Sequence, residues 1–370
     1  MSEGANVSQK VRAPGASDAP PSDGARVRRA PGASDAPPSD GARVRRAPAA
    51  GRLQGALGAA GVYLVVLLLM LLGTVLSKEF LTATNLLNTL RAVALLGIVA
   101  SGVAFVTYSG HYADLSVPAT MALSGIVAVA TIDHGFAAGV AAALLAGCAV
   151  GLANGLVVGY LRGNPIIWTL AMGSVLDGFL RWRCSGTQIY PDAATAAGQA
   201  FLRLYGKDLA GGGPLIVLVL ALLVAAGHLA LHGTRYGAQL KLVGSAYPVA
   251  RMTGVNVRRV VAVAFVLSAF TASLGGVLLA SLNQVGAPYL GKDYDFMAVT
   301  AVVVGGVTLA GGRGSLFGVL GGVLVIGLMR NIMTLLTIGT FAQDIVQGIV
   351  FILVVGAHSY QLRKAGRDDA

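Results

Sequence analysis

Long apolar runs separated by short polar segments make up the chain from Ala56 onward. A soluble core could not bury so many runs of about 17 residues or more, whereas a helix that crosses the hydrocarbon core of a bilayer needs about 20 apolar residues. The pattern therefore predicts an all-α polytopic membrane protein with about ten transmembrane helices. The expected spans are 56–76, 92–109, 115–132, 136–158, 165–181, 213–232, 259–281, 297–310, 315–336 and 340–357.

The eighth predicted span is short and rich in glycine. Phe296–Ala310 contains Gly305 and Gly306, and residues 311–314 add three more glycines around Arg313. At a rise of about 1.5 Å per residue, this helix barely crosses a hydrocarbon core of about 30 Å. Such a span is typical of a broken helix that faces a transport pathway. A tight turn between two ordinary spans is the competing interpretation.

Glycine also recurs every fourth residue in two other spans. The first stripe comprises Gly147, Gly151, Gly155 and Gly159, and the second Gly314, Gly318 and Gly322. Because small residues let helix backbones approach closely in a membrane, both stripes predict helix packing.

Residues 1–52 differ in kind from the rest of the chain. The 17-residue segment Arg12–Arg28 is repeated without change as Arg29–Arg45, and both copies are rich in Pro, Ala, Ser and Asp. Such a segment cannot bury enough apolar surface to offset its ordering entropy, so a disordered tail is expected. The predicted organisation is this tail, a membrane domain over 53–360 and a C-terminal tail over 361–370.

Composition and charge agree with this fold class and limit the partners. Residues of the AVILMFWYC set make up 55% of the chain, charged residues 12%, and the mean hydropathy is +0.73. The net charge is +11, but nine of the 27 Lys and Arg residues precede residue 53. No basic amphipathic helix or aromatic-lined basic groove accompanies them, so membrane anchoring explains the charge and nucleic acid is not expected. An even number of spans then places both basic termini in the cytoplasm.

Catalytic, metal-binding and cofactor-binding patterns are not found in the sequence. His228 and His232 have the spacing of a zinc-binding HExxH motif but lack its glutamate. No phosphate-binding P-loop is present, so any ATP that drives this protein must be bound by another chain. Asp177 and Asp344 lie near predicted span ends, where they are either interfacial groups or ion-coupling carboxylates of a secondary carrier.

Asp114 directly precedes Leu115–Pro118, at the start of the third predicted span. Aspartate before a helix with proline in its first turn is typical of an N-cap. A polar group that faces a transport pathway is the alternative.

The longest predicted cytoplasmic segment, 233–259, has the features of a short helix. Ser245 can cap the helix, Pro248 is tolerated in its first turn, and Gly254 can end it. Its apolar residues, together with Arg251, would form either a face that docks on a partner or part of a surface loop. These apolar residues are Val249, Ala250 and Met252.

Several ordered motifs resemble the permease family of bacterial ATP-binding cassette (ABC) importers for ribose, xylose, arabinose and galactosides. Asp114–Val117 is similar to the family's DLSV element, Gly151–Gly155 to GxxNG and Thr169–Met172 to TLxM. Gly244–Val257 resembles its coupling stretch, and Ala298–Gly322 its glycine-rich run AVxxVVLGGTSLxGGxGxxxGTxxGA. The sequence departs from the family at Asp177, where arginine is usual, and at Ser245, near a usual asparagine.

The resemblance implies the permease subunit of a monosaccharide importer in the bacterial inner membrane. It also implies ATPase subunits that bind ATP, a periplasmic sugar-binding protein and a second permease copy or paralogue, in addition to membrane lipid. Ala250, Arg251 and Gly254 would contact the ATPase. An ion-coupled secondary transporter remains the alternative. The candidates for the translocation pathway are Asp114, Ser116, Asn154, Gly305 and Gly306.

Overall fold

The computed structural model describes residues 49–209 and 212–368, with side chains over 61–209 and 212–356. Helices and their connections account for this part of the chain, which contains two isolated β-bridges but no strand. The predicted all-α class is therefore confirmed. Most of the predicted tail 1–52 lies outside the described residues. The helices are α1 (Ala49–Leu76), α2 (Ala83–Tyr108), α3 (Val117–Thr131), η1 (Ile132–His134), α4 (Phe136–Gly159), α5 (Pro165–Arg183), α6 (Ala196–Leu204), α7 (Leu215–Gly233), α8 (Arg235–Ser245), α9 (Tyr247–Met252), α10 (Val257–Asn283), α11 (Tyr294–Val304), α12 (Leu316–Leu335) and α13 (Thr340–Asp368).

Six helical segments in the described residues are long and apolar enough to cross a membrane, so the predicted count of about ten spans is not confirmed. They are Ala83–Tyr108, Val117–His134, Phe136–Gly159, Leu215–Gly233, Val257–Asn283 and Leu316–Leu335. Shorter apolar helices cover Gly61–Leu76, Tyr294–Val304 and Thr340–Gly356. Helix α5 matches the predicted span 165–181 in position but carries three charged residues towards its C-terminal end and is not among the six.

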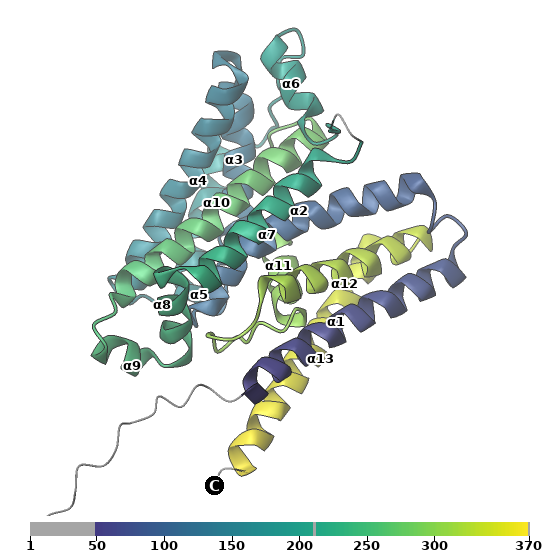
Figure 1. Ribbon diagram of the computed structural model, residues 1–370. Coiled ribbons are helices and arrows are strands. Elements are labelled where there is room, and N and C mark those ends of the chain that lie inside the picture. The colour runs from purple at the N-terminus through teal and green to yellow at the C-terminus, as the bar shows by residue number, and fades with distance from the viewer. Residues whose placement is uncertain (1–48, 210–211, 369–370) are drawn as a thin grey trace, which may run out of the picture. The chain divides into compact units, whose positions relative to one another are not determined.

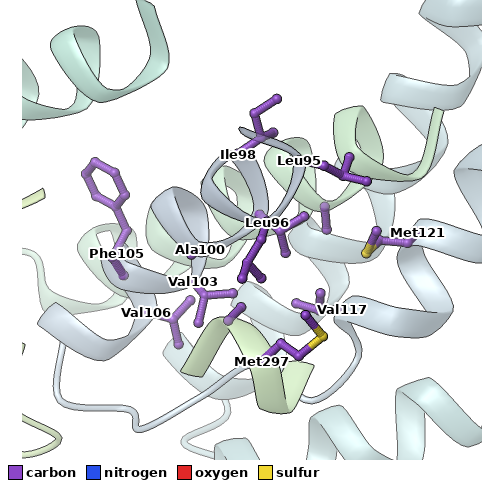
Figure 2. Close-up of a cluster of buried hydrophobic side chains, with 14 of the residues drawn as sticks. Leu95, Leu96, Ile98, Ala100, Val103, Phe105, Val106, Val117, Met121 and Met297 are labelled. Atoms are coloured by element: carbon purple, nitrogen blue, oxygen red, sulfur yellow. The ribbon is translucent and has the colours of Figure 1, made fainter. Parts of the chain in front are cut away.

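Helix α10 lies at the centre of the fold, packed against α2, α3 and α4 (Figure 1). The second half of α2 is buried around its whole circumference, as expected for a helix that is apolar on every side. Figure 2 shows its side chains beside residues of α3 and α11. The labelled residues of this cluster are Leu95, Leu96, Ile98, Ala100, Val103, Phe105 and Val106 of α2, Val117 and Met121 of α3, and Met297 of α11.

The first glycine stripe lies along α10, which confirms that it packs helices together. A Cβ atom at Gly151 would lie 2.6 Å from the Cβ atom of Ala269, and one at Gly155 would lie 2.6 Å from the Cα atom of Ala262. Glycine therefore allows α4 and α10 to approach more closely than any side chain would. The second stripe likewise faces α11 and the residues that follow it.

Helix α2 is followed by the non-helical segment 109–116, and α11 stops early and is followed by the non-helical segment 305–315. Helix α11 has eleven residues, about 16 Å at the usual rise, which is too short for a hydrocarbon core of about 30 Å. Both helices end in a left-handed glycine, Gly110 with φ +81° and Gly306 with φ +82°. Each glycine is followed by a backbone hydrogen bond back to the helix, of the type that closes a Schellman cap.

Candidate functional site

Asp114 lies in segment 109–116 and is 1% exposed. Its Oδ1 atom accepts hydrogen bonds from the backbone N–H of Ser116 at 3.1 Å and from the Ser116 hydroxyl at 2.6 Å. Its Oδ2 atom accepts one from the hydroxyl of Ser268 on α10 at 3.1 Å. Ser116, not Asp114, is the N-cap residue of α3, so the predicted N-cap assignment was wrong by two residues. Pro118 does lie in the first turn, as predicted.

A chain of hydrogen bonds links this carboxylate to two further helices. The amide Nδ2 of Asn154 on α4 donates to the Ser116 hydroxyl at 2.8 Å. The indole Nε1 of Trp168 on α5 donates to Oδ1 of Asn154 at 3.0 Å. The hydroxyl of Thr169, also on α5, accepts from the backbone N–H of Leu115 at 3.1 Å. We call these side chains the polar cluster: Asp114, Ser116, Asn154, Trp168, Thr169 and Ser268.

The polar cluster brings together three of the five predicted pathway residues, namely Asp114, Ser116 and Asn154. Sequence reasoning missed Trp168 and Ser268 as members. Thr169 lies in the TLxM-like motif that was recognised, but no role was assigned to it. Trp168 is the residue directly before that motif, whereas Ser268 is one of several hydroxyl residues in the apolar helix α10 and carries no signal of its own.

The electrostatics of the polar cluster depend on how deeply Asp114 is buried. Burial raises the pKa of the Asp114 carboxyl above its usual range, because a low-dielectric environment disfavours the charged form. The hydrogen bonds from Ser116 and Ser268 lower the pKa and offset this shift only in part. The donors around the carboxyl group are all neutral, so they can hold it in place without a buried ion pair.

Gly305 and Gly306 lie outside the polar cluster. A Cβ atom at Gly305 would lie 2.5 Å from the carbonyl oxygen of Gly318 on α12, so Gly305 sits against that helix. Gly306 ends α11 and has no atom within 4 Å of its ideal Cβ position. That these two residues line a pathway stays a prediction.

The predicted helix in segment 233–259 is in fact a pair of helices, α8 and α9, followed by 253–256. Ser245 is the last residue of α8 rather than the cap of the next helix, so that prediction was wrong. Pro248 in the first turn of α9 and Gly254 after its end agree with the prediction. Ala250 is fully buried, whereas Arg251 is exposed. Of the three residues of the expected apolar face, only Ala250 therefore points inward.

The outer surface of α9 nevertheless exposes large apolar side chains. Met252 is 87% exposed, Val249 is 48% exposed and Tyr247 is 41% exposed. Arg251 lies among them on this single short helix. Exposed apolar groups beside a cation are typical of a surface that a partner protein covers.

Three chain segments meet through glycine backbones at the end of α8, and we call this contact the glycine junction. The N–H of Gly312 donates to the carbonyl oxygen of Tyr108 at 2.9 Å. A Cβ atom at Gly244 would lie 2.5 Å from the nitrogen of Gly312, and one at Gly110 would lie 3.3 Å from the carbonyl oxygen of Ala310. The α8–α9 pair is therefore in direct contact with both non-helical segments, 109–116 and 305–315.

Asp177 and Asp344 each form an ion pair with an arginine. Asp177 accepts from Arg181 at 2.8 Å, one turn along α5, and Asp344 accepts from Arg330 of α12 at 2.5 Å. All four side chains are partly exposed. Neither carboxylate belongs to the polar cluster.

Comparisons with known proteins agree on one class of protein. Residues 85–355 match the protein-family model described as branched-chain amino acid transport system / permease component. The chain is 35% identical to the ribose import permease protein of Bacillus subtilis (strain 168), over 82% of this chain and 93% of that protein. It is 33% identical to the L-arabinose ABC transporter permease protein of Azospirillum brasilense, over 82% and 88% respectively. It is 31% identical to the ribose import permease protein of Escherichia coli (strain K12), over 79% and 91%.

Proposed function

Because the chain belongs to the family of transport permease components, we propose that it is the permease subunit of an ABC importer that carries a monosaccharide across the bacterial inner membrane. The family and the apolar helices make it a multi-pass membrane protein. The proposed substrate class, a monosaccharide, rests on the relatives to which the chain is similar. Although the family is described by amino-acid transport, the relatives that cover most of the chain are ribose and L-arabinose permeases.

The proposed assembly contains this permease, a second permease copy or paralogue, two ATPase subunits and a periplasmic sugar-binding protein. This subunit is not an enzyme and binds no ATP itself. Both termini lie in the cytoplasm, and so does the α8–α9 pair. The exposed face of α9, with Arg251 beside Val249 and Met252, docks on the ATPase. Ala250 anchors α9 from the inner side, and Gly254 ends the helix.

Motion of the ATPase reaches the pathway through the glycine junction. When α8 shifts, the backbone contacts of Gly244 and Gly312 leave no flexible side chain to absorb the displacement. The end of α2 at Tyr108 moves with them, and segment 109–116 follows directly. That segment carries Asp114 and Ser116, so the shift strains the polar cluster that holds α3, α4, α5 and α10 together.

An ion-coupled secondary transporter is the alternative function. It would require Asp177 or Asp344 to exchange an ion during transport, and each is instead held in an ion pair with an arginine. The pairing favours the ABC importer, in which the energy comes from ATP on another chain.

The first test is to tag the C-terminus, purify the chain gently and identify what accompanies it. A co-purifying ATPase with a P-loop is the expected result. The complex in sealed vesicles should then take up D-ribose or L-arabinose only when ATP is supplied on the ATPase side, together with the binding protein. Uptake by the chain alone that stops when the proton gradient is collapsed would establish the secondary transporter instead.

The docking face of α9 is tested by Arg251→Glu and Gly254→Pro. Both variants should lose at least about tenfold in ATP-driven uptake. Arg251→Glu changes only an exposed side chain, whereas Gly254→Pro also distorts the backbone at the end of α9, because proline cannot adopt the φ of +78° found there. Arg203→Glu on α6 is the matched control, since it reverses an exposed charge outside the α8–α9 pair. Normal uptake by both test variants would refute the assignment.

A further inference from the structure

We propose that a cavity between α3, α5 and segment 284–293 is a binding site for the monosaccharide inside the permease, an inference that rests on the proposed function. Its volume is about 350 Å³. This is at the lower end of the range of about 300–1,000 Å³ that is common for small-molecule sites, as a single sugar requires. We call it the α5 pocket. The lining residues that matter here are Leu115, Pro118, Asp177, Arg181, Tyr289 and Lys292.

The α5 pocket shares a wall with the polar cluster. Leu115, which lines the cavity, stands between Asp114 and Ser116 in sequence, and its backbone N–H is bound by Thr169 at 3.1 Å. Pro118, in the first turn of α3, extends the same wall. A molecule in the α5 pocket therefore lies against the segment that the glycine junction connects to α8.

Three charged side chains, those of Asp177, Arg181 and Lys292, give the α5 pocket hydrogen-bonding groups. Asp177 and Arg181 form an ion pair at 2.8 Å, and their side chains remain 44% and 60% exposed. Charged groups in a membrane helix face protein or a water-filled path, because hydrocarbon does not solvate them. A carboxylate and a guanidinium can each form two hydrogen bonds with neighbouring hydroxyl groups. The charges of Asp177 and Arg181 neutralise each other, and the ammonium group of Lys292 adds a further hydrogen-bond donor for the hydroxyl groups of a sugar.

Tyr289 adds an aromatic surface to the same cavity. It is 58% exposed, and its hydroxyl donates to Oε1 of Gln188 at 2.6 Å, which fixes the direction of the ring. The exposed face of a tyrosine ring packs well on the C–H groups of a sugar, while its hydroxyl end stays polar. The α5 pocket thus combines the apolar surface and the hydrogen-bonding groups that a monosaccharide needs.

Chemical labelling of the purified full-length permease tests binding directly. Ser174 lines the α5 pocket and is exposed, so Ser174→Cys should react with a water-soluble maleimide. Near-saturating D-ribose or L-arabinose should slow that reaction by about threefold or more, because a bound sugar covers the thiol. Val175→Cys is the matched control, since Val175 is 67% exposed on the same helix but does not line the cavity. The parent chain corrects for Cys148 and Cys184.

Transport by the assembled complex tests the role of the site. Tyr289→Ala should reduce ATP-driven pentose uptake by about tenfold or more while ATP hydrolysis continues, whereas Tyr289→Phe should keep most of the uptake. Absence of sugar protection at Ser174→Cys, or normal uptake by Tyr289→Ala, would overturn the proposed site while the importer function stands. Sugar protection of the Ser174→Cys thiol, together with no ATP-driven uptake by the wild-type complex, would support the site and overturn the importer function.

Discussion

The non-helical segments that follow α2 and α11 begin in the same way but connect to the next helix through different hydrogen bonds. After α2 and after α11, a left-handed glycine closes a similar backbone cap. Segment 305–315 then leads into α12 through Ser315, whose hydroxyl accepts the N–H of Gly318 at 2.9 Å as an ordinary N-cap. Segment 109–116 leads into α3 through Ser116, whose hydroxyl makes no such cap and instead bonds to Asp114 and Asn154.

Ser315 therefore has a local structural role, whereas Ser116 connects helices that are distant in sequence. The side chain of Ser315 stabilises only its own helix, and segment 305–315 is held to its neighbours by close backbone contacts at glycine. The side chain of Ser116 gives up its local hydrogen bond to join groups on other helices. Breaking these hydrogen bonds would free α3, α4 and α10 to move relative to one another, as a conformational switch requires. Under the proposed coupling, we therefore expect segment 109–116 to switch and segment 305–315 to have a fixed, supporting role.

Removing the carboxylate should have the largest effect on stability. Asp114→Ala takes the acceptor from the N–H and hydroxyl of Ser116 and from the hydroxyl of Ser268, all of them buried. We expect a loss of about 2–4 kcal/mol, because the hydroxyls can rotate to other acceptors but the N–H cannot. The measurement is thermal unfolding of the purified protein in detergent. Asp114→Asn keeps one acceptor oxygen and should lose much less, and equal stability of both variants would contradict this assignment.

A methyl group at Gly305, the first residue of segment 305–315, should have an intermediate effect on stability. In Gly305→Ala the new Cβ atom meets the backbone of Gly318, which cannot rotate away, so a loss of about 1–3 kcal/mol is expected. Gly306→Ala is the matched control. Its Cβ atom meets nothing, and only the cost of the left-handed conformation, about 1 kcal/mol, remains. The same unfolding assay ranks the two, and a greater loss for Gly306→Ala would mean that packing against α12 is not what holds this segment.

Alanine substitutions at the two N-cap residues, Ser315 and Ser116, test the smallest stability effect and should differ most clearly in their effect on uptake. Ser315→Ala loses one local cap, worth about 1 kcal/mol, and should leave ATP-driven uptake close to that of the wild type. Ser116→Ala leaves the amide of Asn154 without its acceptor and should reduce uptake strongly. Equal uptake by the two variants would remove the distinction between the segments.

The sequence pattern located most of the helices but not α6 and α8. The runs that became α2, α3, α4, α7, α10 and α12 are long and apolar, so each was predicted from its own residues. Helix α6 has nine residues of mixed polarity, and α8 is similarly polar, so neither contributes a hydropathy signal. Helix α11 ends at Val304 rather than at Ala310 because its glycine cap closes there.

The candidate site was only partly visible in the sequence. Asp114, Ser116 and Asn154 were found because each belongs to a motif with a family resemblance. Ser268 bonds to Asp114 across 154 positions of sequence, and no local pattern marks such a partner. The α5 pocket was missed for the same reason. Tyr289 lies in a short non-helical segment, and its position beside Asp177 and Arg181 depends on how distant segments pack.

The fluorescence of the Trp168 indole can report on the state of the polar cluster. The chain has two tryptophans, and the other one, Trp182, is 76% exposed. Trp182→Phe would therefore leave a single fluorophore whose N–H is held by Asn154 at 3.0 Å. If transport opens this hydrogen bond to water, the emission of Trp168 shifts towards the red during each catalytic cycle of the proposed ATPase. The protein thus carries an intrinsic optical probe at the junction of α3, α4 and α5, and stopped-flow fluorescence could follow its turnover without any added dye.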